Sequence, residues 1–113
     1  MERHYKLERL RELADNDNAF ILTLVETFLE EVPEDAKHLK EAVVNKNKPQ
    51  AYQIAHKMKP TIDVFELGVL ETLIEIEDWA KSENNDEDVL IQLDKVLLAV
   101  ESASNEIKAD FNL

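Results

Sequence analysis

The stretch from Phe20 to Val44, FILTLVETFLEEVPEDAKHLKEAVV, decides the fold class. Its apolar residues recur every three or four positions, which is the period of one buried helical stripe. Pro33 lies inside the stretch, so we expect a kink or a break there. The pattern predicts a long amphipathic helix with an apolar stripe made of Leu22, Val25, Phe28, Leu29, Val32, Ala36, Leu39 and Val43.

The same period continues on both sides of this stretch. A short helix at about residues 5–15 precedes it, and Pro49 suits the first turn of the helix that follows. A fourth helix is expected from about Leu67 to Ala80, and a fifth after the polar segment 82–88. The remaining apolar positions are Leu7, Leu10 and Leu13; Ala51, Ala55, Met58, Ile62 and Phe65; Leu70, Leu73 and Ile74; Val89, Leu93, Val96, Leu97, Val100, Ala103 and Ile107.

The predicted fold is therefore all-α: an antiparallel four-helix bundle, at about residues 18–110, with a short extra N-terminal helix. We expect residues 1–113 to form a single, complete domain. The chain holds one glycine, Gly68, and no cysteine. A single glycine disfavours hairpin-rich folds and excludes the glycine-rich loops that bind ATP or NAD.

The formal net charge of −12 excludes two classes of partner. Nucleic acid and anionic membranes both require lysine and arginine to neutralise phosphates, so this chain should bind neither. The N-terminal residues MERHYKLERLRE have no apolar core and do not form a signal peptide. The dense apolar run Ala19–Val25 is far too short to span a bilayer. We expect a cytoplasmic protein.

His56 lies in the middle of the third predicted helix but away from its apolar stripe. On a helical wheel it falls about 150° from the centre of that stripe, so its imidazole should face solvent. No acidic residue occurs between Glu41 and Asp63, whereas this window holds Lys46, Lys48, Lys57 and Lys59. We expect cations around His56, in a patch that suits one phosphoryl group but not a duplex.

Other readings of the histidines are less specific. An exposed helical histidine is commonly a plain surface residue, and we read His4 and His38 in that way. A di-metal bundle needs paired Glu-x-x-His spacings on two helices, whereas only Asp35–His38 comes close and it has no counterpart. No metal site is expected.

The segment Ala55-His56-Lys57-Met58-Lys59 resembles the signature of histidine-containing phosphotransfer (HPt) domains of two-component phosphorelays, and Leu67 matches the apolar residue that closes it. The similarity covers nearly the whole chain, because the helix count and order agree as well. It implies that His56 accepts a phosphoryl group, on Nε2, from an aspartyl phosphate of a response-regulator receiver domain and passes it to another receiver. Lys59 and Lys57 would lie near the phosphoryl oxygens.

The resemblance also implies a phosphocarrier rather than an enzyme. The receiver supplies the carboxylates and the magnesium, so this chain needs no cofactor of its own. Receiver domains, including that of a hybrid sensor kinase, are the expected partners of a monomer. Their docking surface would include Tyr52, Gln53 and Pro60 around His56, with Phe20 and Leu24 of the preceding helix.

One residue departs from the family pattern. Pro60 stands where the family usually has glycine, so helix three either bends there or ends at Lys59. This puts the docking geometry in doubt but leaves the nucleophile in place.

Two alternatives stay open. The chain could be a helical interaction module whose His56 is never phosphorylated. It could also be the dimerisation and phosphoacceptor segment of a sensor kinase, although an acid usually follows the histidine there and proline comes five residues on; here Lys57 follows and proline comes at four.

Overall fold

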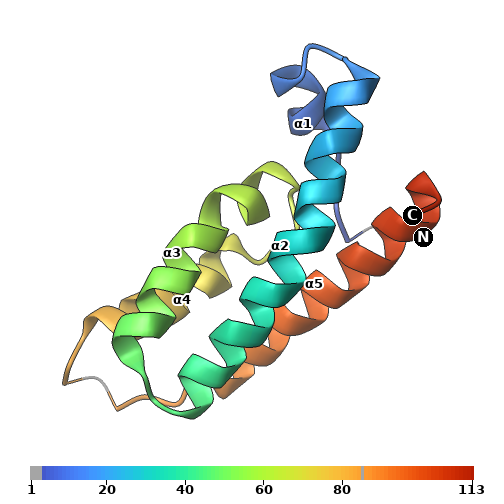
Figure 1. Cartoon of the computed structure of the whole chain (residues 1–113). Coiled ribbons are helices and arrows are strands. Elements are labelled where there is room, and N and C mark those ends of the chain that lie inside the picture. Colours follow the sequence, from blue (N-terminus) through green and yellow to red (C-terminus); the bar gives the residue numbers. More distant parts are fainter. Residues whose placement is uncertain (1–3, 85) are drawn as a thin grey trace.

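The computed structural model describes residues 4–84 and 86–113, and these residues contain helices but no strand (Figure 1). The predicted all-α architecture is confirmed: four long helices pack antiparallel and a short helix precedes them. The helices are α1 (Glu8–Leu13), α2 (Asn18–Val44), α3 (Lys48–Val64), α4 (Leu70–Lys81) and α5 (Leu90–Phe111).

The four long helices follow one another around the bundle. α2 packs against α3, α3 against α4 and α4 against α5, and α5 closes the ring by packing on α2. The bundle is elongated, with principal extents of 46, 24 and 22 Å (Figure 1). In this order α3 and α5 lie diagonally across the bundle. The solvent-exposed faces of these two helices therefore point to opposite sides of the molecule.

α2 and α3 each begin at a polar residue whose side chain caps the helix. The Asp17 carboxylate accepts hydrogen bonds from the backbone N–H groups of Ala19 and Phe20, at 3.0 and 3.3 Å, and so caps α2. Asn47 caps α3 in the same way, and Pro49 lies in the first turn of α3, as predicted. Gly68 has a φ of +79° in the turn before α4, a conformation that strains other residues.

The predicted apolar stripes are largely buried, but several of their residues stay partly or fully exposed. The α3 and α5 stripes are buried apart from the half-buried Leu97. In α2, however, Ile21 is buried and Leu22 is 38% exposed; in α4 it is Ile76, not Ile74, that reaches the core. Leu13 is 68% exposed. Periodicity could not separate Ile21 from Leu22, because both stand one turn before Val25.

Neither internal proline breaks its helix. α2 continues through Pro33 and α3 continues through Pro60. Of the alternatives expected at each proline, a kink or an end of the helix, the end is therefore ruled out. Proline has no N–H, and the carbonyl of His56 therefore lacks the usual helical donor from residue 60. Pro60 is exposed, which leaves that side of the helix open to water.

Residues 4–6 are held against the bundle by hydrogen bonds. The Lys6 N–H donates to the carbonyl of Phe65 at 2.8 Å, and the buried Tyr5 donates its hydroxyl to Asp110. His4, expected to be a plain surface residue, hydrogen-bonds Glu106 near the end of α5.

Replacing Pro60 should stabilise the fold. Pro60→Ala returns the N–H that the carbonyl of His56 lacks and should raise the free energy of unfolding by roughly 1–3 kcal/mol. Chemical denaturation measures the change. Pro49→Ala is the matched control, because a first-turn N–H has no helical acceptor and the substitution should change little. Equal effects of the two substitutions would contradict this account of Pro60.

Candidate functional site

His56 lies at the middle of α3 with 62% of its side chain exposed, as the helical wheel predicts. The ring is held on two sides. Tyr52, one turn earlier, stacks against it with ring centroids 5.7 Å apart and planes inclined by 16°. The second contact is polar and comes from another helix.

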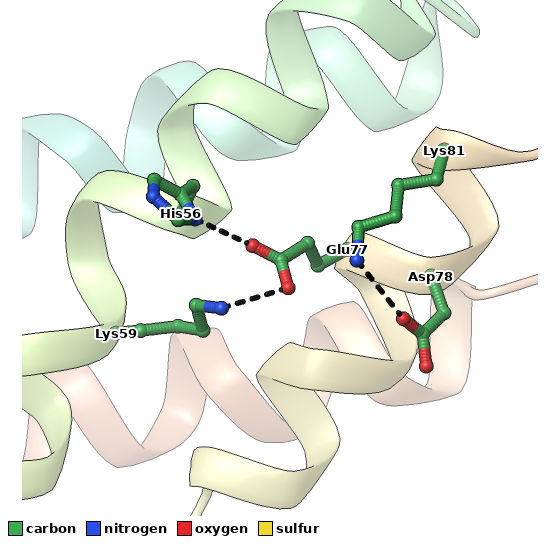
Figure 2. A network of polar contacts seen from close by, with 5 residues as sticks. All are labelled: His56, Lys59, Glu77, Asp78 and Lys81. Atoms are coloured by element: carbon green, nitrogen blue, oxygen red, sulfur yellow. Dashed lines mark hydrogen bonds and ion pairs between the residues drawn. The ribbon is translucent and has the colours of Figure 1, made fainter.

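That contact is the carboxylate of Glu77 on α4 (Figure 2). Glu77 Oε2 lies 3.0 Å from His56 Nδ1, and its other oxygen accepts a hydrogen bond of 2.8 Å from Lys59 Nζ. Only 3% of the Glu77 side chain is exposed. The expectation that His56 would have only cations as neighbours was therefore wrong, because packing of α4 on α3 brings an acid from 21 residues further along the chain.

The sequence did contain a signal for Glu77. It stands within the apolar stripe of α4, where Leu73, Ile76 and Ala80 are buried around it. Burying a carboxylate lowers the stability of the folded state unless charged or hydrogen-bonding groups contact it. An acid within an apolar stripe therefore indicates that a facing helix supplies such groups.

Glu77 stays ionised although it is buried. Burial raises the pKa of a carboxyl group, but the hydrogen bonds from Lys59 and His56 and the positive charges of Lys59 and Lys81 outweigh burial. The net result is a Glu77 pKa below its ordinary value. The site therefore holds a fixed negative charge beneath the imidazole at neutral pH.

This carboxylate sets the tautomer of His56. An ionised carboxylate can only accept hydrogen bonds, so Nδ1 of a neutral His56 must carry the proton and Nε2 must carry the lone pair. Figure 2 shows the other ring nitrogen turned away from Glu77. The arrangement presents a nucleophilic nitrogen to solvent from a ring fixed by stacking and by a hydrogen bond.

The predicted lysine cluster is divided among several contacts. Lys59 binds Glu77 and is 27% exposed, whereas Lys57 turns to Asp35 on α2 at 3.1 Å. Lys48 donates to the carbonyl of Ser82 and lies 5.0 Å from the centre of the Trp79 ring. Among the contacts of residues 4–84 and 86–113, Lys59 is the one lysine of the four that shares a hydrogen-bond partner with His56.

A lysine outside the predicted cluster also approaches the site. Lys81 at the end of α4 lies 5.9 Å from the centre of the Tyr52 ring, and its ammonium is 3.9 Å from Asp78 Oδ1 (Figure 2). It is 53% exposed. Nothing in the local sequence pattern singled it out, because its position follows from the packing of α4 against α3.

An apolar groove lies one helical turn beyond His56. It joins α1, α2 and α3 and brings together Phe20, Leu24 and Pro60, which the sequence predicted for one docking surface. Phe20 is 48% exposed and Leu24 is half-buried. Of the other two docking candidates, Gln53 is exposed and Tyr52 is half-buried against His56. The groove is lined mainly by Leu10, Leu13, Phe20, Leu24, Pro60 and Val64.

No protein-family model matches the chain, and searches of curated proteins and of solved structures find no match. Within residues 4–84 and 86–113, no group of three or more His, Cys, Asp or Glu side chains is placed to hold a metal ion. No helix in that part of the chain has the length and apolar character needed to cross a membrane.

The buried carboxylate should make the stability depend on pH. Because the pKa of Glu77 is lower in the folded state, its contribution is full above the unfolded-state pKa near 4.5 and is lost as the pH falls through the folded-state pKa. Glu77→Gln should lower the free energy of unfolding by roughly 1–3 kcal/mol at neutral pH.

Denaturation at a series of pH values checks this. The difference between wild type and Glu77→Gln should shrink as the solution is acidified. The exposed Glu75, two residues earlier on α4, supplies the control variant Glu75→Gln, which should match wild type throughout. A difference that stays constant into acid would show that Glu77 does not act through its charge.

Proposed function

We propose that the chain is a phosphohistidine carrier that takes a phosphoryl group from an aspartyl phosphate of a receiver domain on His56 Nε2 and passes it to another receiver. The observation that carries the proposal is the His56–Glu77 pair: Nδ1 lies 3.0 Å from a buried, ionised carboxylate while 62% of the side chain is exposed. An imidazole oriented in this way is a nucleophile without a further base.

The transfer step can be written from these atoms. The Nε2 lone pair attacks phosphorus, a P–N bond forms, and the P–O bond to the aspartate breaks so that the carboxylate leaves as an anion. The Nδ1 proton stays on the ring or is shared with Glu77. Positive charge builds on the imidazole as the P–N bond forms, and the fixed carboxylate stabilises it. The reverse sequence returns the phosphoryl group to the next aspartate.

The lysines have distinct roles in this scheme. Lys59 keeps Glu77 ionised and in place. This role is additional to the contact with phosphoryl oxygens that the resemblance implies. Lys81 is within reach of a group on the exposed side of the ring, because it lies over Tyr52, which stacks on His56. Lys57 is paired with Asp35 and is exposed, so it suits contacts with a partner. Phosphoryl transfer depends mainly on such positioning and charge neutralisation.

The receiver would dock on the apolar groove beside His56. Phe20 and Leu13 expose apolar surface there, and such a surface next to a nucleophile suits a protein partner. The receiver brings its own carboxylates and magnesium, so this chain needs only to present the imidazole. Because such receiver domains are cytoplasmic, we infer that the carrier is cytoplasmic as well.

The second candidate is an interaction module whose His56 is never phosphorylated. The apolar groove alone would serve that function equally well. The sensor-kinase segment is not favoured, because helices α2 to α5 complete the bundle within one chain. Chemical phosphorylation and receiver profiling separate the two remaining candidates.

The phosphoryl group should be attached to His56 and to no other residue. Incubation with phosphoramidate or with a panel of phosphorylated receivers should place acid-labile phosphate on the wild type, seen by mass spectrometry, and none on His56→Gln. Lys59→Ala should slow transfer modestly. Glu77→Gln should slow it about tenfold or more, because the positioned partner of the ring is weakened.

Two results would overturn this proposal. Failure of every receiver and of phosphoramidate to label the wild type would favour the interaction module. Labelling that persists in His56→Gln would place the phosphate elsewhere. Equal losses from Lys59→Ala and His56→Gln would contradict the supporting role given to Lys59.

Mutation should separate the binding of the receiver from the phosphorylation of His56. Phe20→Glu puts a charge into the apolar groove and should weaken receiver binding about tenfold, while labelling by phosphoramidate stays unchanged. Val44→Glu, at the other end of α2, changes a residue of similar exposure, 57% against 48%, and should leave both unchanged. Binding measured by calorimetry tests this; equal effects of the two variants would place docking elsewhere.

A further inference from the structure

A groove of about 370 Å³ lies between α2 and α5, which pack side by side (Figure 1). Three lysines line it: Lys37 and Lys40 from α2, and Lys108 from α5. Lys37 and Lys40 are three residues apart, so their side chains leave α2 on the same face. Glu101 is the one acid among the described residues that line the groove. The groove therefore holds more positive than negative charge.

The three groove lysines have no acidic partner, unlike the lysines near His56. Lys57 and Lys59 each pair with a carboxylate, at 3.1 and 2.8 Å. Among the residues that the structure describes, Lys37, Lys40 and Lys108 form no ion pair, and all three are exposed. The chain has 25 acidic and 13 basic residues, so three neighbouring cations without a carboxylate partner form a local positive surface on an acidic protein.

The groove is also lined by a residue whose buried hydroxyl has no hydrogen-bond partner. Ser104 lies on α5 one turn before Lys108 and is 6% exposed. Its Oγ bonds to none of the described residues, whereas Thr23 and Thr27 on α2 donate to the carbonyl four residues earlier. Buried hydroxyls nearly always have a partner, so Ser104 indicates that a water molecule or a ligand atom supplies one.

The floor of the groove is apolar. Ala36 and Val100 are buried there, and Pro33 and Leu97 are half-buried beside them. The volume falls within the range of small-molecule sites, about 300–1,000 Å³. Cations around an apolar floor suit a ligand that joins a charged headgroup to a short apolar body.

A phosphate ester has the headgroup that these side chains match. It carries a charge of about −1.5 to −2 near neutral pH and offers three acceptor oxygens. The three ammonium groups and the Ser104 hydroxyl supply donors for those oxygens, and none of these groups is a competing acceptor with a negative charge.

We propose that the groove between α2 and α5, formed by Lys37, Lys40, Ser104 and Lys108 over its apolar floor, binds a small organic phosphate. The ammonium groups contact the phosphate oxygens, and the apolar body of the ligand lies on the floor. The Ser104 oxygen is covered in this rotamer, so it donates to the ligand once χ1 turns the hydroxyl into the groove.

This site is separate from the proposed phosphotransfer site. The groove lies between α2 and α5, whereas His56 and Glu77 meet between α3 and α4. A ligand in the groove therefore leaves the imidazole accessible.

Binding should be weak and sensitive to salt. Each exposed ion pair contributes little and is screened by salt, and the net charge of −12 repels anions from the molecule as a whole. We expect a dissociation constant on the order of 1 mM at low ionic strength, so the titration extends to about 20 mM.

Phenylphosphonate is the probe, because its P–C bond excludes transfer of the phosphoryl group to His56. Titration of the full chain at constant pH and ionic strength, followed by amide chemical shifts in NMR, should give saturable changes around Lys37, Ser104 and Lys108 rather than around His56. Inorganic phosphate lacks the apolar body and should bind about fivefold more weakly.

Substitutions test the individual contacts. Lys37→Ala and Lys108→Ala should each weaken binding about twofold to fivefold. The matched control Lys95→Ala removes an exposed lysine of α5 that lies outside the groove, makes the same charge change and should bind like wild type. Ser104→Ala should weaken binding about fivefold or more. It should not lower the midpoint of thermal unfolding without ligand, because alanine is the better helix former.

Four results would overturn the proposal. The first is the absence of saturable shifts on α2 and α5 up to about 20 mM. Equal losses from Lys37→Ala and Lys95→Ala would show attraction by overall charge rather than a site. Inorganic phosphate that binds as tightly as phenylphosphonate would exclude an organic ligand, and unchanged binding by Ser104→Ala would remove the hydroxyl from the site. None of these results bears on labelling of His56, so this proposal and the proposed function fail independently.

Discussion

The carboxylate of Glu77 is the interaction on which the site depends. It is almost fully buried, yet it remains ionised because Lys59 and His56 both bind it from α3. Removing Lys59 or His56 would leave this buried charge less compensated and would therefore lower the stability of the fold. The same contact therefore ties α4 to α3, fixes the tautomer of the imidazole and leaves Nε2 exposed.

The rest of the site is built around this contact. Tyr52 holds the second side of the ring by stacking, and Lys81 lies over Tyr52 in turn. The apolar groove begins one turn further along α3 and uses Pro60, whose ring sits on the exposed side of a helix that continues to Val64. A rigid helix thus presents an exposed imidazole and an apolar surface side by side, an arrangement that suits the proposed transfer between proteins.

Sequence reasoning found the parts of the site that lie on one helix. His56, Tyr52, Lys59 and Pro60 share a face of α3 because residues three and four apart do so in any helix. It missed Glu77 and Lys81, which come from α4, and it overstated the lysine cluster. Lys48 and Lys57 turn to Ser82 and Asp35, because each cation takes the nearest acceptor on a neighbouring element.

By itself, the sequence determined the helical fold, the order of the helices and the outward direction of His56, because the spacing of apolar residues is a local property that needs no partner. Only the tertiary structure decided which charged group meets the imidazole and which residues of each stripe reach the core. Those outcomes depend on the rotation of each helix against its neighbours. Residues such as Ile21 and Leu22, or Lys57 and Glu77, are told apart only once that rotation is fixed.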